Sequence, residues 1–223
     1  ERAKGGRGIL LGGVPGVAPA KVVVIGGGVV GENAIYMALG MAADVTVLDR
    51  NVEVLARLAR RFGAALKTVY STKAALEDYV LQADLVVGGV LVAGAEAPKL
   101  VTRDMVRRMK RGSVLVDVAI DQGGCFETSH PTTHAEPTYV VDGVVHYCVA
   151  NMPGAVPNTS TYALNNVTLP YALALADKGY KKALLEDANF LAGLNVCGGK
   201  VTYKAVADDL GYEYVDPRAA LAG

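Results

Sequence analysis

The chain has 223 residues, of which 52% are hydrophobic, and its 22 lysine and arginine residues balance 22 aspartate and glutamate residues. This length and apolar content predict a well-buried core and exclude a disordered chain. The balanced charge offers no basic field to nucleic acid or to an anionic membrane surface, and no apolar run approaches the roughly eighteen residues that cross a bilayer. We therefore expect a small-molecule partner, with no nucleic-acid or membrane partner.

The cysteines exclude two further devices. Cys125, Cys148 and Cys197 lie far apart without a C-x-x-C spacing, so neither a disulfide framework nor a zinc site is indicated. We expect reduced thiols, no bound metal and a cytoplasmic location.

The first residues show neither an initiator methionine nor a signal-peptide pattern. The run from Glu1 to Gly6 is typical of the end of a helix at a glycine C-cap, which predicts a chain that begins inside a longer protein. The apolar run from Gly8 to Pro19 contains several glycines and prolines and no periodicity, which favours a hinge or connector.

The most informative stretch begins at Lys21, where an apolar strand-like run to Ile25 meets a glycine-rich turn and a helix-compatible segment over 29–42. Gly26, Gly28 and Gly31 fit the G-x-G-x-x-G spacing. The first glycine makes the tight turn, the second lets the backbone approach a pyrophosphate, and the third lets helix and strand pack closely. The free N–H groups at the helix start would face the phosphates. The alternative is a glycine-rich turn in some other α/β domain.

A second predicted strand, over 44–48, ends at Asp49. A carboxylate at this place accepts the ribose hydroxyls in a dinucleotide-binding fold and repels a 2′-phosphate, so it predicts NAD rather than NADP as the cofactor.

Helix-like and strand-like segments alternate from here to residue 124. Asn51 can cap a helix that Gly63 ends, and either Ser71 or Thr72 can cap the next. This rhythm predicts an α/β fold with a doubly wound parallel sheet, the Rossmann type of dinucleotide-binding fold. The expected helices are 51–62, 72–82 and 102–110, and the expected strands are 65–70, 83–88 and 112–120.

The pattern changes after residue 138. Asp142-Gly143 predicts a tight turn between two short strands within 139–149. From Thr159 onward the sequence predicts helices without a sheet of their own, the first interrupted by Pro170 and closed by Gly179. Further helices are expected over 181–188 and 201–210. We therefore expect an NAD-binding domain over 1–157 and a helical part of a second, substrate domain over 158–223.

Ligands of an open α/β sheet bind at the carboxyl ends of its strands. That edge collects the glycine loop and Asp49, together with Ser71, which either caps a helix or contacts the adenosine half of the cofactor. It also collects Asp121, which follows the predicted fifth strand. A carboxylate there can titrate beside a nicotinamide ring or a reacting nitrogen, whereas the simpler interpretation is a cap or turn residue before two glycines. His130, His134 and His146 form no cluster in the sequence, and each is more often a satisfied polar residue than a catalytic one.

Several segments together closely resemble bacterial L-alanine dehydrogenase, and the resemblance covers nearly the whole chain. The most specific are Asp121-Gln-Gly-Gly124 and Ala150-Asn-Met-Pro-Gly154. The others are Gly12-Gly-Val-Pro-Gly-Val17, Gly26-Gly-Gly-Val-Val-Gly31, Val116-Asp-Val-Ala-Ile120, Pro131-Thr-Thr-His134 and Thr168-Leu-Pro-Tyr171.

The resemblance implies reversible NAD-dependent oxidative deamination of L-alanine to pyruvate and ammonia, usually by a hexamer. It implies that Asp121 is the catalytic aspartate and that Asn151 lies beside the substrate. Together with the glycine loop, the expected cofactor contacts are Gly26, Gly28, Val29, Val30, Gly31, Asp49, Ser71, Val90, Leu91, Val118, Ala119, Ile120, Asp121, His130, Val149, Ala150, Asn151 and Met152.

Some features depart from the family pattern. Val54 stands where relatives carry a lysine, and His130 where some carry an arginine. The family's catalytic histidine and its substrate-binding arginine and lysine belong to a long N-terminal segment that these residues do not include. We therefore expect the helices after Asn158 to pack against that segment, and the chain alone to be inactive.

Two alternatives stay open. The NAD-binding subunit of proton-translocating transhydrogenase shares the two-domain plan but would carry a different sequence at residues 121–124. In the second alternative the chain is a non-catalytic NAD-binding or assembly module and is complete as it stands. This alternative stays open because a fold alone does not decide function.

Overall fold

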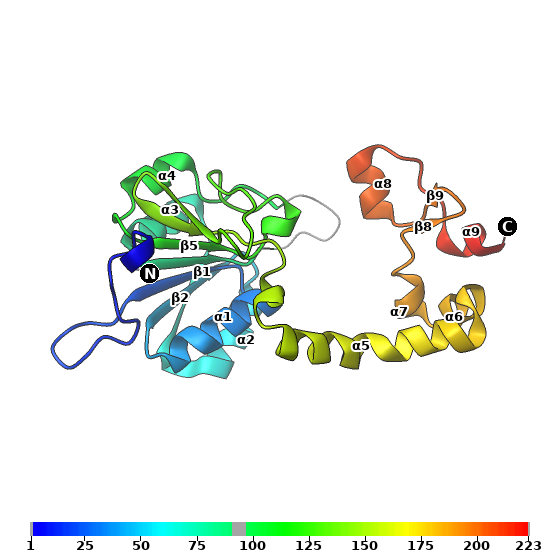
Figure 1. Ribbon diagram of the computed structural model, residues 1–223, viewed down its shortest axis with the longest axis horizontal. Helices are drawn as coiled ribbons and strands as arrows, with labels where there is room; N and C mark the ends of the chain where they lie inside the picture. The colour runs from blue at the N-terminus through cyan, green and yellow to red at the C-terminus, as the bar shows by residue number, and fades with distance from the viewer. Residues whose placement is uncertain (1, 91–96, 223) are drawn as a thin grey trace. The chain divides into compact units, whose positions relative to one another are not determined.

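The computed structural model describes residues 2–90 and 97–222, which form two compact units that we describe separately (Figure 1). The first unit extends to Met152, and the second begins at Pro153. This division falls slightly before the boundary expected at residue 157. The assignment of the later residues to a substrate domain stays a prediction.

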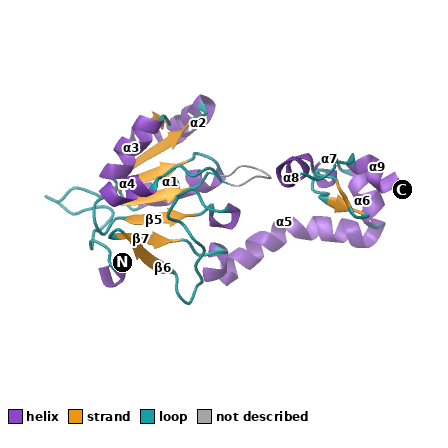
Figure 2. Cartoon of the chain, turned by 90° about the horizontal axis from the view of Figure 1, so that it is seen from above, coloured by secondary structure: helices purple, strands orange, loops and turns teal. Residues whose placement is uncertain are grey.

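The first unit contains a seven-stranded sheet with the order β3-β2-β1-β4-β5-β7-β6. Neighbouring strands are parallel except for the β6–β7 pair, so the predicted doubly wound α/β fold is confirmed. Figure 2 shows β6 and β7 together at one edge of the sheet. The strands are β1 Lys21–Ile25, β2 Asp44–Asp49, β3 Leu66–Tyr70, β4 Leu85–Gly88, β5 Val114–Asp117, β6 Thr138–Val141 and β7 Val144–Tyr147.

Four helices cover the two faces of this sheet: α1 (Val29–Gly40), α2 (Val52–Phe62), α3 (Lys73–Gln82) and α4 (Arg103–Arg108). Because side chains alternate between faces along a strand, β1 contributes to two separate cores. Val22 and Val24 pack with the buried side chains of α1 and α2, whereas Val23 and Ile25 pack with those of α3 and α4. Figure 1 shows the two helix pairs on opposite sides of the strands.

The helix caps decide one alternative that the sequence left open. The Thr72 hydroxyl accepts a hydrogen bond from Ala75 N at 3.1 Å, so Thr72, and not Ser71, caps α3. Asn51 caps α2 by accepting from Glu53 N and Val54 N, as expected. Gly63, with φ of 57°, ends α2 in a conformation that favours glycine.

The predicted hairpin is also present. Asp142 and Gly143 both have positive φ, 51° and 83°, which is the geometry of a two-residue turn that matches the twist of its strands. The hairpin joins the parallel sheet because β7 pairs with β5.

The fifth strand differs from the prediction. It ends at Asp117, not at Ile120, because the buried Asp117 side chain accepts a hydrogen bond from Ala119 N at 3.2 Å and turns the backbone. Asp121 therefore does not follow the strand directly. It lies in a one-turn 3₁₀ helix, η3 (Ile120–Gln122).

The second unit is mostly helical, but two predictions for it are wrong. The first helix, α5 (Pro157–Lys178), continues through Pro170, because a proline removes one backbone hydrogen bond while the flanking turns persist. A small two-stranded sheet, β8 (Val196–Cys197) and β9 (Lys200–Val201), also interrupts the predicted all-helical region. The remaining helices are α6 (Tyr180–Glu186), α7 (Ala188–Leu191), α8 (Lys204–Leu210) and α9 (Pro217–Ala222).

The second unit has a small core of Leu184, Leu191 and Leu221, and no residue of α5 is buried. Within the described ranges, we find no helix with both the length and the apolar character needed to span a membrane.

Candidate dinucleotide-binding site

The loop between β1 and α1 has the geometry that its glycines imply. Gly26 has φ of 94°, a conformation that side chains disfavour, and its N–H donates to Leu48 O at 2.8 Å. A Cβ on Gly31 would lie 1.8 Å from Gly26 O, so the helix can approach the strand only without one. A Cβ on Gly28 would meet nothing within 4 Å, which leaves space beside the backbone for a bound group.

The start of α1 lacks the side-chain cap that the other helices of this sheet have. Asn51, Thr72 and Thr102 each cap the start of α2, α3 or α4 with a side-chain oxygen, whereas Gly28 precedes α1 without one. The first amides of a helix need acceptors, and the helix dipole favours a negative one. The loop is therefore suited to bind an anion such as a pyrophosphate.

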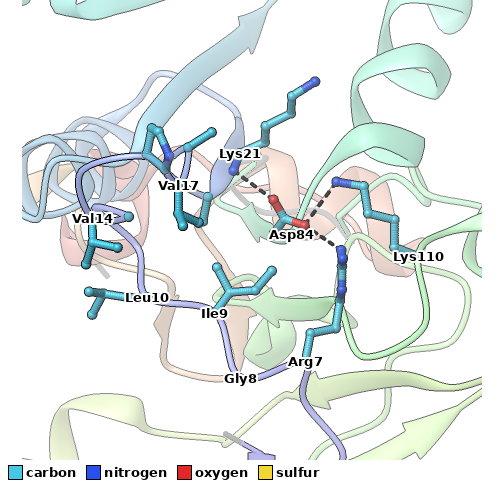
Figure 3. Close-up of a pocket in the computed structure, with 13 residues that line it drawn as sticks. Arg7, Gly8, Ile9, Leu10, Val14, Val17, Lys21, Asp84 and Lys110 are labelled. Carbon is cyan, nitrogen blue, oxygen red and sulfur yellow. Dashed lines mark hydrogen bonds and ion pairs between the residues drawn. The ribbon is translucent and has the colours of Figure 1, made fainter.

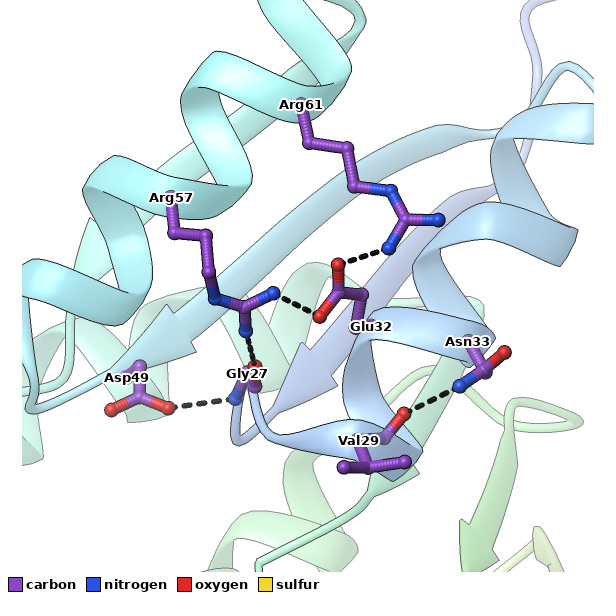
Figure 4. Close-up of polar contacts among 7 residues, drawn as sticks. All are labelled: Gly27, Val29, Glu32, Asn33, Asp49, Arg57 and Arg61. Atoms are coloured by element: carbon purple, nitrogen blue, oxygen red, sulfur yellow. Dashed lines mark hydrogen bonds and ion pairs between the residues drawn. The ribbon is translucent and has the colours of Figure 1, made fainter.

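Asp49, at the end of β2, is joined to the glycine loop. Its Oδ2 accepts from Gly27 N at 2.7 Å (Figure 4). Its Oδ1 accepts from Asn51 N at 2.8 Å. These two bonds fix the orientation of the half-buried carboxylate. Because a carboxylate has about four acceptor positions, lone pairs remain for ribose hydroxyls.

An ion-pair group behind the loop was not predicted from the sequence. Glu32, in the first turn of α1, accepts hydrogen bonds from both Arg57 and Arg61 of α2, and Arg57 also donates to Gly27 O at 3.2 Å (Figure 4). These two guanidinium groups lower the pKa of the Glu32 carboxyl. The signal that could have revealed the group is the pair of arginines one helical turn apart.

Two neighbouring strand ends supply further candidates. Ser71 follows β3, and its N–H donates to Asp49 O at 3.0 Å. Val90, just after β4, is partly buried, and its Cγ2 would lie 3.0 Å from a Cβ on Gly26. Val90 therefore borders the glycine loop, whereas Ser71 is joined to Asp49. Leu91 lies outside the described residues.

The segment after β5 carries a buried run and an exposed carboxylate. Val118 N donates to Gly88 O at 2.9 Å, which fixes the segment to the end of β4. Ala119 and Ile120 are buried, whereas Asp121 is exposed. The neighbouring Gln122 has a buried side-chain oxygen, Oε1, with no hydrogen-bond partner in the part of the chain that the structure describes. An orphaned acceptor of this kind suits a site that a ligand completes.

The segment after β7 lies at the same carboxyl edge. Val149 is buried, and Ala150 N donates to Thr132 O at 3.1 Å. Asn151 is exposed with φ of 56°, and His134 Nε2 lies 3.0 Å from its backbone oxygen. Met152 is half-buried.

The histidines have separate environments. His130 stacks on Tyr139 with ring centroids 3.7 Å apart, and Tyr139 stacks on His146 at 4.9 Å. His146 is fully buried, with Nε2 at 2.7 Å from Thr128 Oγ1 and Nδ1 at 3.0 Å from Val144 O. Burial lowers the pKa of His146, so the ring is neutral near pH 7. This agrees with its interpretation as a satisfied polar residue.

The site as a whole fits a dinucleotide. It has open space at Gly28, an uncapped helix start and an oriented carboxylate on the next strand. Val29, in the first turn of α1, is 81% exposed, as is suitable for an apolar side chain that a ligand covers. Across the described ranges, we find no cluster of three histidine, cysteine or acidic residues that could hold a metal ion.

The curated proteins to which the chain is most similar include several alanine dehydrogenases. The chain is 68% identical over 223 residues to the alanine dehydrogenase of Halomonas elongata, matching 100% of this chain and 60% of that protein. It is 59% identical over 222 residues to the alanine dehydrogenase of Bacillus subtilis, matching 99% of this chain and 59% of that protein. The chain thus spans about three fifths of the length of these curated relatives.

Solved structures agree with this result. An L-alanine dehydrogenase structure superposes with a TM-score of 0.86 and 55% identity, covering 95% of this chain and 58% of that one. A transhydrogenase from Sinorhizobium meliloti superposes with a TM-score of 0.60 and 32% identity, covering 69% of this chain and 44% of that one. The family model described as "Alanine dehydrogenase/PNT, C-terminal domain" matches residues 1–204, and the chain therefore belongs to that family.

Proposed function

We propose that this chain supplies the NAD site of an enzyme that reversibly deaminates L-alanine to pyruvate and ammonia. The observation that carries the activity is the 55–68% identity to alanine dehydrogenases over essentially the whole chain. The cofactor follows from the family and from a glycine loop that is hydrogen-bonded to Asp49. Hydride acceptance is the chemistry that NAD provides when bound.

In this proposal the N–H groups at the start of α1 bind the pyrophosphate and Asp49 accepts the ribose hydroxyls. The exposed Val29 and Val30 cover one face of the cofactor, and Ser71 lies toward its adenosine half. The other proposed cofactor contacts are Gly26, Gly28, Gly31, Val90, Leu91, Val118, Ala119, Ile120, Asp121, His130, Val149, Ala150, Asn151 and Met152.

Oxidation of alanine removes a hydride from Cα and a proton from the amine, and hydrolysis of the resulting imine releases ammonia. We assign the proton-holding role on this chain to Asp121, because it is an exposed carboxylate beside a buried backbone segment at the carboxyl edge. Asn151 would orient the substrate, and its left-handed backbone supports a constrained position.

The oligomeric state and location are part of the proposal. We infer a homo-oligomer, a hexamer by resemblance, in the cytoplasm. The helix α5 supports an oligomer because it offers an apolar surface for a subunit contact. It has no buried residue, and Tyr162, Leu164 and Val167 are 63–68% exposed.

The test is NAD-dependent turnover by the full gene product. Reduction of NAD with L-alanine as the sole reductant, and its reversal with pyruvate and ammonia, would support the proposal. Transhydrogenation between NADH and an NADP analogue without alanine would favour the transhydrogenase alternative. NAD binding without either reaction would favour a non-catalytic module. The lower identity to the transhydrogenase structure, 32% against 55%, speaks against the first alternative.

A further inference from the structure

A carboxylate that takes no part in the proposed chemistry lies directly beneath the segment that carries Asp121. Asp117, the last residue of β5, is 0% exposed. Its Oδ2 accepts from Cys125 N at 2.9 Å, from Phe126 N at 3.3 Å and from Ser129 Oγ at 2.5 Å. Its Oδ1 accepts from Ala119 N at 3.2 Å.

These bonds connect both ends of one loop. Ala119 lies at its beginning, and Cys125 and Ser129 lie toward its end, so Asp117 fixes residues 119–129 from inside the protein. Within the loop, Gly124 has φ of 76°, and a Cβ there would lie 2.7 Å from Asp117 Oδ2. The carboxylate and the glycine therefore fit each other closely.

A lysine fixes the same loop from outside. Lys99 Nζ donates to Gly124 O at 2.8 Å and also to Gly123 O. Backbone bonds add to this clamp, since Ala97 N donates to Gln122 O at 2.9 Å and Leu100 N donates to Cys125 O at 2.8 Å. The short 3₁₀ turn that bears Asp121 is thus held from inside by the Asp117 carboxylate and from outside by residues 97–100.

We propose that Asp117 is a positioning residue. It holds the turn that carries Asp121 in the position that turnover requires. This inference rests on the proposed function and deepens it. Asp117 is fully buried and bonded to the loop, so it acts through Asp121 and does not touch the substrate itself. Reactive groups need this kind of support, because a displacement of about 1 Å can reduce the rate roughly a hundredfold.

An Asp117→Asn change tests the idea because it keeps the shape and removes one acceptor. The carboxylate accepts N–H or O–H groups at both oxygens, whereas an amide accepts at only one. If the amide oxygen takes the Oδ2 position, its NH₂ group faces Ala119 N–H. Two donors then face each other where the carboxylate accepted a hydrogen bond, so we expect the turn to shift.

The same chain offers a matched control at the amino ends of the strands, opposite the carboxyl ends where Asp117 lies. Asp84 precedes β4 and accepts from Lys21 N at 2.9 Å, from Arg7 Nη1 at 2.8 Å and from Lys110 Nζ at 3.0 Å (Figure 3). Like Asp117, it accepts from a backbone N–H and from side chains, which are charged in this case. Burial raises the pKa of the Asp84 carboxyl, but these partners outweigh burial and lower it. Asp84→Asn should lower stability without changing catalysis.

The experiment compares both variants with the wild-type full gene product. For Asp117→Asn we expect kcat to fall roughly ten- to a hundredfold, while the Kd for NAD changes less than about threefold because the glycine loop and Asp49 dominate binding. For Asp84→Asn we expect a lower Tm and an unchanged kcat. A kcat for Asp117→Asn within threefold of wild type, despite a lower Tm, would assign Asp117 a purely structural role and overturn the proposal.

Hydrogen exchange separates this proposal from the proposed function. In Asp117→Asn, the amides of Ala119, Cys125 and Phe126 should exchange faster while those of β1 stay protected. That result would show that Asp117 holds this loop even if the wild-type protein did not oxidise alanine, whereas the fall in kcat tests whether turnover depends on the loop. Unchanged exchange at these amides would refute the proposal. If Asp117→Asn fails to fold, Ser129→Ala removes only one donor and should give the same local effect at smaller amplitude. No local effect in that variant would likewise refute the proposal.

Discussion

Single residues explain the expected choice of cofactor. Asp49 is held between Gly27 N–H and Asn51 N–H, so its negative charge stays beside the loop that would bind the pyrophosphate. A 2′-phosphate at that position would meet a like charge, whereas ribose hydroxyls would find an acceptor.

We predict that NAD binds in clear preference to NADP and that Asp49→Ala narrows this preference by about tenfold, equivalent to about 1.4 kcal/mol. Calorimetry with both nucleotides measures the change. Asp44→Ala is the control, because Asp44 begins the same strand and pairs with Lys67, at 2.6 Å, away from the carboxyl edge. Equal binding of NAD and NADP by the wild-type chain would show that Asp49 does not face the ribose.

At Asp121 we predict a loss of turnover without a loss of folding. The residue is exposed, so Asp121→Asn in the full gene product should lower kcat by at least about tenfold and leave Tm nearly unchanged. Steady-state kinetics and thermal unfolding of the same sample give both values. A variant with wild-type kcat and reduced Tm would instead identify Asp121 as a turn residue.

Elements explain why parts of the structure were predictable and others were not. Local patterns were sufficient for β1, α1 and the hairpin of β6 and β7, because turn glycines and alternating apolar residues carry their own signals. The end of β5 depended on the Asp117 side chain, which accepts from Ala119 N and is held in place by partners as distant as Ser129, which a short window of sequence does not contain. The arginine pair on α2 was missed for the same reason, since its partner Glu32 lies on another helix.

The ion pairs between Glu32 of α1 and the arginines of α2 stabilise the region of the glycine loop, and we expect this stabilisation to be lost in acid. Arg57 and Arg61 lower the pKa of Glu32 from its usual 4.5. The folded state therefore prefers ionised Glu32. The stabilisation is complete above the unfolded pKa near 4.5 and is lost as the pH falls through the lower folded value.

We accordingly predict that Glu32→Gln flattens the dependence of Tm on pH below about pH 4.5 and leaves the slope near neutrality unchanged. Glu53→Gln on α2 is the control, because Glu53 is exposed and its N–H, not its carboxylate, takes part in the cap. If Tm falls equally steeply with decreasing pH in Glu32→Gln and in the wild type, the ion pairs of Glu32 with Arg57 and Arg61 contribute no stability.

At the scale of the whole molecule, the cofactor half of the chemistry is better supplied than the substrate half. The first unit has a seven-stranded, mostly parallel sheet with cores on both faces and the glycine loop at the carboxyl ends of its strands. Of the histidines, His146 is buried and bonded at both ring nitrogens, and His130 stacks on Tyr139. The chain also spans only about three fifths of its curated relatives.

The last prediction concerns the 223 residues by themselves. We expect this chain to bind NAD and to produce no NADH from alanine. Hydride transfer requires the alanine amine and Cα to be held against the nicotinamide with a base in reach, and small misplacements are costly. Asp121 and Asn151 are the groups assigned to the substrate here, and neither is a cation that could anchor its carboxylate.

The decisive comparison uses one preparation of the purified chain, assayed for NAD binding by calorimetry and for alanine-dependent NADH formation by absorbance. Binding without turnover is expected, because the glycine loop and Asp49 are joined within the first unit, whereas neither Asp121 nor Asn151 is a cation that could bind the substrate carboxylate. Asp49→Ala in the same chain should weaken binding and so confirm that the signal arises from this site. Steady NADH production from alanine by the chain alone would reveal a base and an anchor within these residues, and it would contradict the proposed division of roles.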